Sequence, residues 1–146
     1  MFPIIKPRKI KFALVGCGRI SKNHFGSIEK HADSMELVAV CDINLERARE
    51  HGDQFGVPHF KNFETMLTES DSDMVILCTP SGLHPRETVV AARHGLNVMN
   101  EKPMATRWRA GLELVKACDA ARVRLFVVQQ NPPKAPVQLL QPSVVA

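Results

Sequence analysis

The sequence predicts an α/β fold in which a doubly wound parallel sheet carries helices on both faces. Short apolar runs, typical of buried strands, alternate along the chain with segments whose apolar residues recur at helical spacing. The connections are short, and the apolar runs lack the alternation of strands that have one face in water. Strand–helix repeats of this kind pack as a parallel sheet between two layers of helices.

The elements follow in order from local signals. Strands are predicted at residues 10–15, 36–41, 57–60, 74–78, 97–99 and 125–128. The helix after the first strand is indicated by side chains at helical spacing, which are Ile20, His24, Phe25, Ile28 and His31. Later helices are predicted at residues 45–51 (capped by Asn44, stopped by Gly52), 63–67 (capped by Asn62), 85–94 (Pro85 in the first turn, Gly95 past the end) and 107–121.

Length and charge limit the classes of protein that fit. A chain of 146 residues, 45% of them apolar, can build one domain with its own core. The excess positive charge lies near the start, at Lys6, Arg8, Lys9 and Lys11, and the other 15 basic residues (19 minus 4) balance the 15 acidic ones. This is a basic arm and not a basic face, so no nucleic-acid partner is expected.

Membrane and metal sites are also not expected. The longest runs without charge, such as residues 74–85, are about half the roughly 20 residues that a spanning helix needs, and no signal peptide is evident. Cys17, Cys41, Cys78 and Cys118 form no Cys-x-x-Cys pair, and no His-Glu-x-x-His segment occurs. Buried, reduced thiols of a cytoplasmic protein explain these cysteines best.

A glycine-containing turn follows the first predicted strand. Residues 16–21 read Gly-Cys-Gly-Arg-Ile-Ser, a Gly-x-Gly-x-x-Ser variant of the dinucleotide-binding fingerprint. Gly16 permits a tight turn, Gly18 lets a diphosphate approach the backbone, and Ser21 is small enough for the helix to pack on the strand. The start of the helix offers free N–H groups and a positive dipole. In this strand–turn–helix context the motif predicts a Rossmann-type domain.

Asp42 supplies the second element of the predicted cofactor site. It ends the second predicted strand, where a carboxylate can bind both ribose hydroxyls of an adenosine. The alternative is an ordinary solvated acid at a strand end. No Arg directly follows Asp42, so a 2′-phosphate would meet an uncompensated negative charge, which favours NAD over NADP. Arg47 is a candidate to supply the missing cation from elsewhere.

Two further segments lie at the carboxyl ends of predicted strands. They are residues 78–84, Cys-Thr-Pro-Ser-Gly-Leu-His, and residues 100–103, Asn-Glu-Lys-Pro. In a doubly wound sheet this edge holds the ligand. Lys102, between a buried strand and a proline, is a candidate acid/base that Glu101 would orient. The alternative is a surface Glu–Lys pair in a loop.

These segments, in this order and spacing, resemble the glucose–fructose oxidoreductase/inositol dehydrogenase family (Gfo/Idh/MocA) from about residue 9 to residue 130. The resemblance implies an NAD(P)-dependent oxidoreductase that acts on a sugar or cyclitol hydroxyl. It implies catalytic roles for Lys102, which handles the proton of the reacting hydroxyl, and for His84. The residues implied for cofactor binding are Gly16, Gly18, Arg19, Ile20, Asp42, Thr79, Pro80, His84, Glu101 and Lys102.

Within the family, residues 21–24 and 98–105 look most like the bacterial dehydrogenases of UDP-N-acetylglucosaminuronic acid. Those enzymes oxidise the sugar C3 hydroxyl during synthesis of surface polysaccharides such as lipopolysaccharide. The implied partners are a sugar or nucleotide-sugar substrate and, in a full-length protein, further copies of the same chain.

The sequence departs from the family pattern after residue 131. Family members continue into an α+β substrate domain, whereas Pro132 and Pro133 and a weakly charged segment follow here. We expect a basic arm at residues 1–8, a dinucleotide-binding domain at residues 9–131 and an irregular tail at residues 132–146, with the substrate domain missing through truncation or a frame shift. Two hypotheses follow: an NAD-dependent sugar dehydrogenase, or an inactive dinucleotide-binding module or remnant.

Overall fold

The structure is a computed structural model that describes residues 8–129. Strands and helices alternate through these residues. The strands are β1 (Ile10–Val15), β2 (Met35–Cys41), β3 (His59–Phe60), β4 (Met74–Leu77), β5 (Asn97–Asn100) and β6 (Leu125–Val127). The helices are α1 (Ser21–Lys30), α2 (Leu45–Phe55), α3 (Phe63–Glu69), α4 (His84–Arg93) and α5 (Trp108–Ala121). The expected arm, except Arg8, and the expected tail lie outside the described residues.

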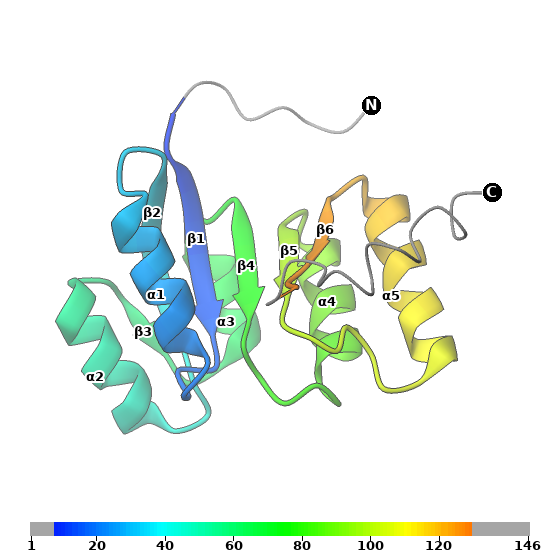
Figure 1. The fold of residues 1–146 in the computed structure, drawn as a ribbon, viewed down its shortest axis with the longest axis horizontal. Coiled ribbons are helices and arrows are strands. Elements are labelled where there is room, and N and C mark those ends of the chain that lie inside the picture. The colour runs from blue at the N-terminus through cyan, green and yellow to red at the C-terminus, as the bar shows by residue number, and fades with distance from the viewer. Residues whose placement is uncertain (1–7, 130–146) are drawn as a thin grey trace, which may run out of the picture.

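These strands form one parallel sheet in the order β3-β2-β1-β4-β5-β6. The chain runs outward from β1 to β3, then crosses to the other side of β1 and continues to β6 (Figure 1). Helices α1 and α2 cover one face of the sheet, and α3, α4 and α5 cover the other. This is the predicted doubly wound, Rossmann-type sheet, and the strand order reverses between β1 and β4.

The central strand β1 is buried on both faces, because alternate side chains of a strand point to opposite sides. Phe12 and Leu14 pack in a cluster with Phe25 of α1. Ala13 and Val15 pack in a second cluster, which contains residues of α3 and α4. Burial on both sides explains why residues 12–15 of this strand read as a continuous apolar run.

Helix α2 is longer than the sequence predicted. Gly52 does not end it, because the helix continues to Phe55. A Cβ atom on Gly52 would lie only 2.9 Å from the Cβ atom of His59, so the glycine allows β3 to pack against the helix. The stop is Gly56, whose φ of 65° lies in the left-handed region that favours glycine. The prediction that Gly52 ends the helix was wrong. It relied on the rule that glycine follows a helix end, whereas this glycine is required by the contact with His59 on another element.

The other boundaries differ little from those predicted, and the predicted helix caps are confirmed. The side chain of Asn44 accepts a hydrogen bond from Arg47 N–H at 3.2 Å, and that of Asn62 accepts one from Thr65 N–H at 2.9 Å. The largest remaining differences are two residues each: β3 contains two residues where four were predicted, and α3 continues to Glu69 where an end at residue 67 was predicted.

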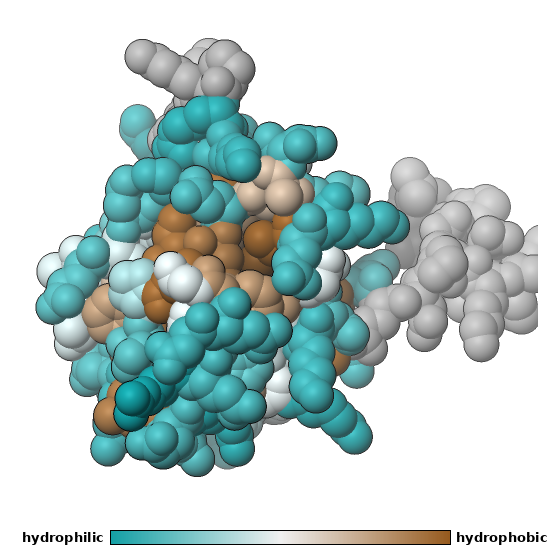
Figure 2. Space-filling model, turned by 90° about the vertical axis from the view of Figure 1, so that its left-hand side faces the viewer, coloured by the Kyte–Doolittle hydropathy of each residue, from teal (hydrophilic) through white to brown (hydrophobic). Residues whose placement is uncertain are grey.

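The short β3 leaves part of the sheet edge uncovered. Strand β2 pairs with it only through Val40 and Cys41. Figure 2 shows this side of the molecule: hydrophilic residues cover most of it, and hydrophobic residues are visible in a hollow near its middle. The lower part of this view, where the strands end, is mostly hydrophilic.

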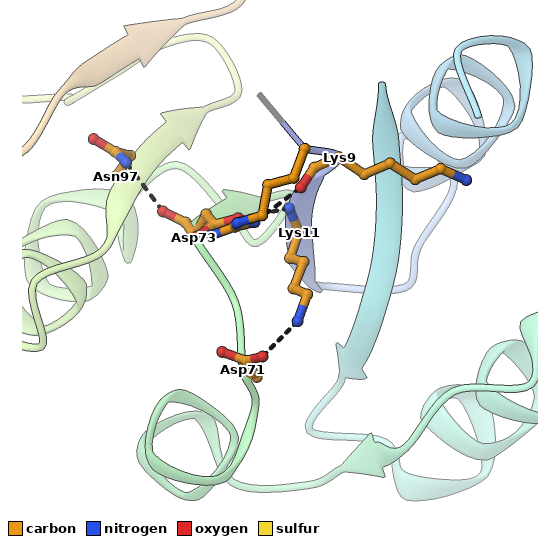
Figure 3. Close-up of polar contacts among 6 residues, drawn as sticks. Lys9, Lys11, Asp71, Asp73 and Asn97 are labelled. Atoms are coloured by element: carbon orange, nitrogen blue, oxygen red, sulfur yellow. Dashed lines mark hydrogen bonds and ion pairs between the residues drawn. The ribbon is translucent and has the colours of Figure 1, made fainter. Parts of the chain in front are cut away.

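At the amino-terminal edge of the sheet, Asp73 connects neighbouring strands (Figure 3). Its carboxylate accepts the N–H of Lys11 at 2.9 Å and two bonds from the guanidinium of Arg8, each 2.7 Å long. Its carbonyl accepts the side-chain amide of Asn97 at 3.1 Å. The Arg8 guanidinium, with a smaller effect of the Lys11 N–H, holds the pKa of Asp73 below its ordinary value.

We predict that Asp73→Ala lowers the free energy of unfolding by about 1–3 kcal/mol near neutral pH, because the N–H of Lys11 loses its acceptor. Since the pKa of Asp73 is lower in the folded protein, this stabilisation is complete above the ordinary aspartate pKa of about 3.9. It is lost as the pH falls through the lower pKa of the folded state.

Urea unfolding at several pH values measures this difference. Asp71→Ala is the matched control, because Asp71 pairs with Lys11 through a side chain that is 91% exposed. Equal losses from the two substitutions, or a loss for Asp73→Ala that does not shrink in acid, would contradict the prediction.

Candidate functional site

The candidate site lies at the carboxyl edge of the sheet, where the strand order reverses. Gly16 makes the turn after β1 with a φ of 87°, and its N–H donates to the carbonyl of Cys41 at 2.8 Å. A Cβ atom on Gly16 would lie 2.8 Å from the carbonyl carbon and oxygen of Cys78, just after β4. Both the backbone conformation and the closeness of this segment therefore require glycine.

Gly18 and the start of α1 leave room for a ligand. A Cβ atom on Gly18 would meet no atom within 4 Å. Ser21 is buried, and its hydroxyl donates to the Gly18 carbonyl at 2.6 Å, which fixes the turn. Helix α1 begins there with no side-chain cap and no acidic residue in its first turn. The N–H groups and dipole of this helix end can therefore act on an anionic group. Of the other predicted residues here, Arg19 is exposed and Ile20 is half-buried.

Asp42 is joined to this turn through the backbone. The residue is 5% exposed, its Oδ2 accepts the N–H of Cys17 at 2.8 Å, and its Oδ1 accepts the N–H of Asn44 at 2.8 Å. A carboxylate has about four acceptor positions, so capacity remains for two hydroxyl donors. The guanidinium nitrogen Nη1 of Arg47, on α2, lies 3.6 Å from Oδ2 of Asp42. The structure thus brings Gly16, Gly18 and Asp42 together as the sequence predicted.

Three buried thiols, those of Cys17, Cys41 and Cys78, lie in or next to the same turn. Cys17, Cys41, Cys78 and Cys118 are all free and buried, as the sequence predicted. Burial, and then the negative charge of Asp42, raises the pKa of Cys17 and of Cys41 to about 12. Burial, and then Glu101, raises the pKa of Cys78 to about 12. These thiols stay protonated at neutral pH and act as small apolar side chains.

His84 holds the loop after β4. Its ring is 1% exposed, with Nε2 2.8 Å from the carbonyl oxygen of Thr79 and Nδ1 3.1 Å from that of Pro103. The ring therefore bridges the two loops that the sequence singled out. The Thr79 hydroxyl donates to the carboxylate of Glu87, whose pKa burial raises, and Pro80 is exposed. The catalytic role of His84 stays a prediction, and its contacts are those of a residue that connects two loops.

Glu101 fixes the loop that carries Lys102. Its side chain is 7% exposed, and its Oε1 lies 2.6 Å from Nε2 of His24 on α1. Its Oε2 accepts the backbone N–H of Lys102 at 3.3 Å, and the Lys102–Pro103 peptide bond is cis. Glu101 therefore orients Lys102 through the backbone, while the Lys102 side chain is exposed. The contact between His24 and Glu101 connects α1, which follows the glycine turn, to the loop that contains Lys102.

Sequence reasoning missed three polar partners at this edge. His24 pairs with a residue 77 positions away, Glu87 receives the Thr79 hydroxyl, and Thr88 shares two hydrogen bonds with the buried side chain of Asn100. The helical spacing of His24 predicted only that it lies on the helix after the first strand, and gave no indication of its partner. Glu87 and Thr88 gave no local signal, because their partners lie on other elements.

The described residues contain no group of three or more His, Cys, Asp or Glu side chains that could hold a metal ion. Within the same residues, no helix has the length and apolar character needed to cross a membrane. The edge instead offers anion-binding N–H groups at one end, a buried carboxylate beside them and an exposed amine at the other end. Groups of these kinds suit an extended anionic ligand next to a proton donor or acceptor.

A family model described as an oxidoreductase family with an NAD-binding Rossmann fold (GFO_IDH_MocA) matches residues 10–129. The chain belongs to this family. The predicted resemblance is therefore confirmed. Among the relatives of this Gfo/Idh/MocA chain, the D-apiose dehydrogenase of Paraburkholderia graminis is 33% identical over 121 residues, which are 82% of this chain and 32% of that protein.

Two crystal structures of WlbA dehydrogenases are more similar in sequence. The protein from Bordetella pertussis is 49% identical with a TM-score of 0.86, over 94% of this chain and 42% of that one. The protein from Chromobacterium violaceum is 51% identical with a TM-score of 0.89, over 98% of this chain and 41% of that one. Both are complexes with NADH and UDP-GlcNAcA. The Gfo/Idh/MocA chain thus spans between 32% and 42% of the length of these relatives.

We predict that His24→Leu lowers the free energy of unfolding by about 1–3 kcal/mol, because it leaves the buried Glu101 carboxylate without its partner. Urea unfolding near neutral pH measures the change. His31→Leu is the control, since His31 follows the end of the same helix and is exposed. Equal stability of the two variants would show that the pair contributes nothing.

Proposed function

We propose that this chain binds NAD along the carboxyl edge of its sheet. The observation that carries the proposal is the turn at Gly16 and Gly18, which leaves open space before the uncapped start of α1. The N–H groups there would hold the diphosphate, and Asp42 would bind the hydroxyls of the adenosine ribose. Thr79, Pro80 and the loop of Glu101 would then lie along the nicotinamide half.

We further propose that Lys102 acts as acid/base on a sugar hydroxyl. NAD, when bound, accepts the hydride from the carbon that carries this hydroxyl. In its neutral form the amine of Lys102 takes the hydroxyl proton and becomes an ammonium, and its exposed position makes it accessible to a substrate. Glu101 and His84 keep the backbone on either side of Lys102 in place through their hydrogen bonds to Lys102 N–H and to the Pro103 carbonyl.

The proposed substrate is UDP-N-acetylglucosaminuronic acid, oxidised at the C3 hydroxyl for lipopolysaccharide synthesis in the cytoplasm. Identities of 49% and 51% to dehydrogenases crystallised with this nucleotide sugar support the choice. The proposal also includes assembly of the full-length protein into a homo-oligomer.

Calorimetric titration of the chain with NADH tests cofactor binding, and we expect Gly18→Ala to weaken it at least about tenfold. The Cβ atom would occupy the space in which the diphosphate approaches the backbone. Gly26→Ala is the matched control, because a Cβ atom at Gly26 also meets no atom within 4 Å but lies inside α1. Equal affinities of the two variants would contradict a diphosphate site at Gly18.

Lys102→Ala separates binding from chemistry. We expect its dissociation constant for NADH to stay within about twofold of the unsubstituted chain, a free-energy change well below 1.4 kcal/mol. In a full-length context, formation of NADH from NAD and UDP-N-acetylglucosaminuronic acid should be lost. A matching loss of NADH affinity would show that the lysine is structural.

The same two assays distinguish the dehydrogenase from the alternative of an inactive module. Binding of NADH without turnover by the unsubstituted chain would assign it the role of a dinucleotide-binding module. Absence of any binding by folded protein would reject both functions.

A further inference from the structure

Helix α5 carries two apolar stripes, and the described part of the chain covers one of them. Leu114 and Cys118 belong to the stripe that is buried. Trp108, Leu112 and Val115 recur at helical spacing on another side of α5 and are exposed, Trp108 to 80%. Surface helices normally place polar and charged side chains on the side that faces water. The second stripe is therefore an apolar surface that no described element covers.

Strand β6 continues this apolar surface. It is the last strand of the sheet, so within the described residues its outer edge pairs with no other strand. Phe126 and Val127 of this strand are exposed. Two hollows of about 450 and 440 Å³ both have Val115 in their lining, and the second of them extends to Phe126. The α5–β6 surface, at the opposite end of the molecule from α2 (Figure 1), consists of Trp108, Leu112, Val115, Phe126 and Val127.

A connected surface of this kind differs from the single exposed apolar side chains that are common on proteins. Connected apolar side chains that surround shared hollows are typical of a contact with another segment or another molecule. The occupant of the α5–β6 surface must itself be apolar, because the five side chains offer it no hydrogen-bond partner except the indole N–H of Trp108.

The chain continues from β6 with a segment of matching chemistry. Residues 130–146 lie outside the described residues and number 17 (146 minus 129). Lys134 is the one charged residue among them, whereas 23% of the whole chain is charged. A segment with so little charge gains by removing its apolar side chains from water. Five aliphatic side chains gather in its second half, at Val137, Leu139, Leu140, Val144 and Val145.

This segment is also long enough to reach the surface. Cys118 of α5 and Leu125 of β6 pack together, so the helix lies directly beside the strand from which the segment continues. Helix α5 has 14 residues and is about 21 Å long. The chain from Gln129 to Val137 spans up to roughly 26 Å when extended. A segment joined to β6 by such a short connection has a local concentration on the order of millimolar, which favours it over a second copy of the chain in dilute solution.

We propose that residues 137–145 fold back over the α5–β6 surface and cover Trp108 with their aliphatic side chains. The contact is independent of cofactor binding, because no residue of the α5–β6 surface belongs to the proposed NAD site. It gives a position to the segment that the sequence predicts only as an irregular tail.

Trp108 reports on this contact directly, because the chain contains one Trp and no Tyr. Quenching of its fluorescence by acrylamide measures its exposure in the complete chain of 146 residues. We expect the quenching constant of the native chain to be at least about threefold lower than that of the chain unfolded in urea, since the covered indole is removed from water. The constant should not change when the protein is diluted, because the contact lies within one chain.

Substitutions in the segment identify the occupant. Leu139→Asp combined with Leu140→Asp should raise the native quenching constant at least about threefold, because carboxylates are not buried against apolar side chains. Gln138→Asp combined with Gln141→Asp is the matched control, since it adds the same charge at polar positions of the same segment. It should leave the constant unchanged. Circular dichroism should be the same for all three proteins, because neither pair of substitutions lies among the described residues.

Each other result would overturn the proposal. A native quenching constant less than about threefold below that of the unfolded chain would show that Trp108 is uncovered. Protection that disappears on dilution, together with a dimer in analytical ultracentrifugation, would assign the surface to a second copy of the chain. Protection that the two leucine substitutions do not change, or that both pairs of substitutions change equally, would show that the leucines do not cover Trp108.

Discussion

The close approach of β1 and β4 at Gly16 is the constraint on which the rest of the site depends. The strand order reverses at this point, so the helices after β1 and before β4 lie on opposite faces of the sheet. In doubly wound sheets the ligand binds at such a point, outside the carboxyl ends of the strands. No side chain fits at Gly16, because a Cβ atom would collide with the backbone carbonyl of Cys78. The glycine turn can therefore lie low against the sheet, directly before the uncapped start of α1.

Buried polar contacts then fix each loop at this edge relative to another. Asp42 connects the loop after β2 to the glycine turn, His84 connects the loop after β4 to the loop after β5, and Glu101 connects the latter to α1. In the described part of the chain, no buried side-chain nitrogen or oxygen lacks a hydrogen-bond partner. Buried polar networks are rigid when every member is satisfied, so the edge can present a fixed set of groups to a ligand.

Local sequence was sufficient for features that local backbone physics determines. The strand periodicity and the caps at Asn44 and Asn62 each depend on residues within a few positions of one another, and the structure confirms them. Gly52 shows the limit of that approach. A side chain at this position would collide with the Cβ atom of His59, which lies on another element. A rule about helix ends takes no account of that contact, so it assigned Gly52 the wrong role.

The same limit applied to the polar partners of the site, and it matters most at Lys102. The motif around this lysine identified a candidate amine. Its backbone N–H, however, is held by Glu101, whose other carboxylate oxygen pairs with His24, 77 residues away. Asn100 and Glu101 are buried, whereas the next side chain, Lys102, is exposed. The protein thus avoids the desolvation penalty of a buried ammonium while the backbone that carries it is fixed on one side by Glu101 and on the other by His84. A side chain held in this way keeps its solvation until a ligand displaces the water, and a preorganised backbone lowers the entropy that must be lost when the ligand binds.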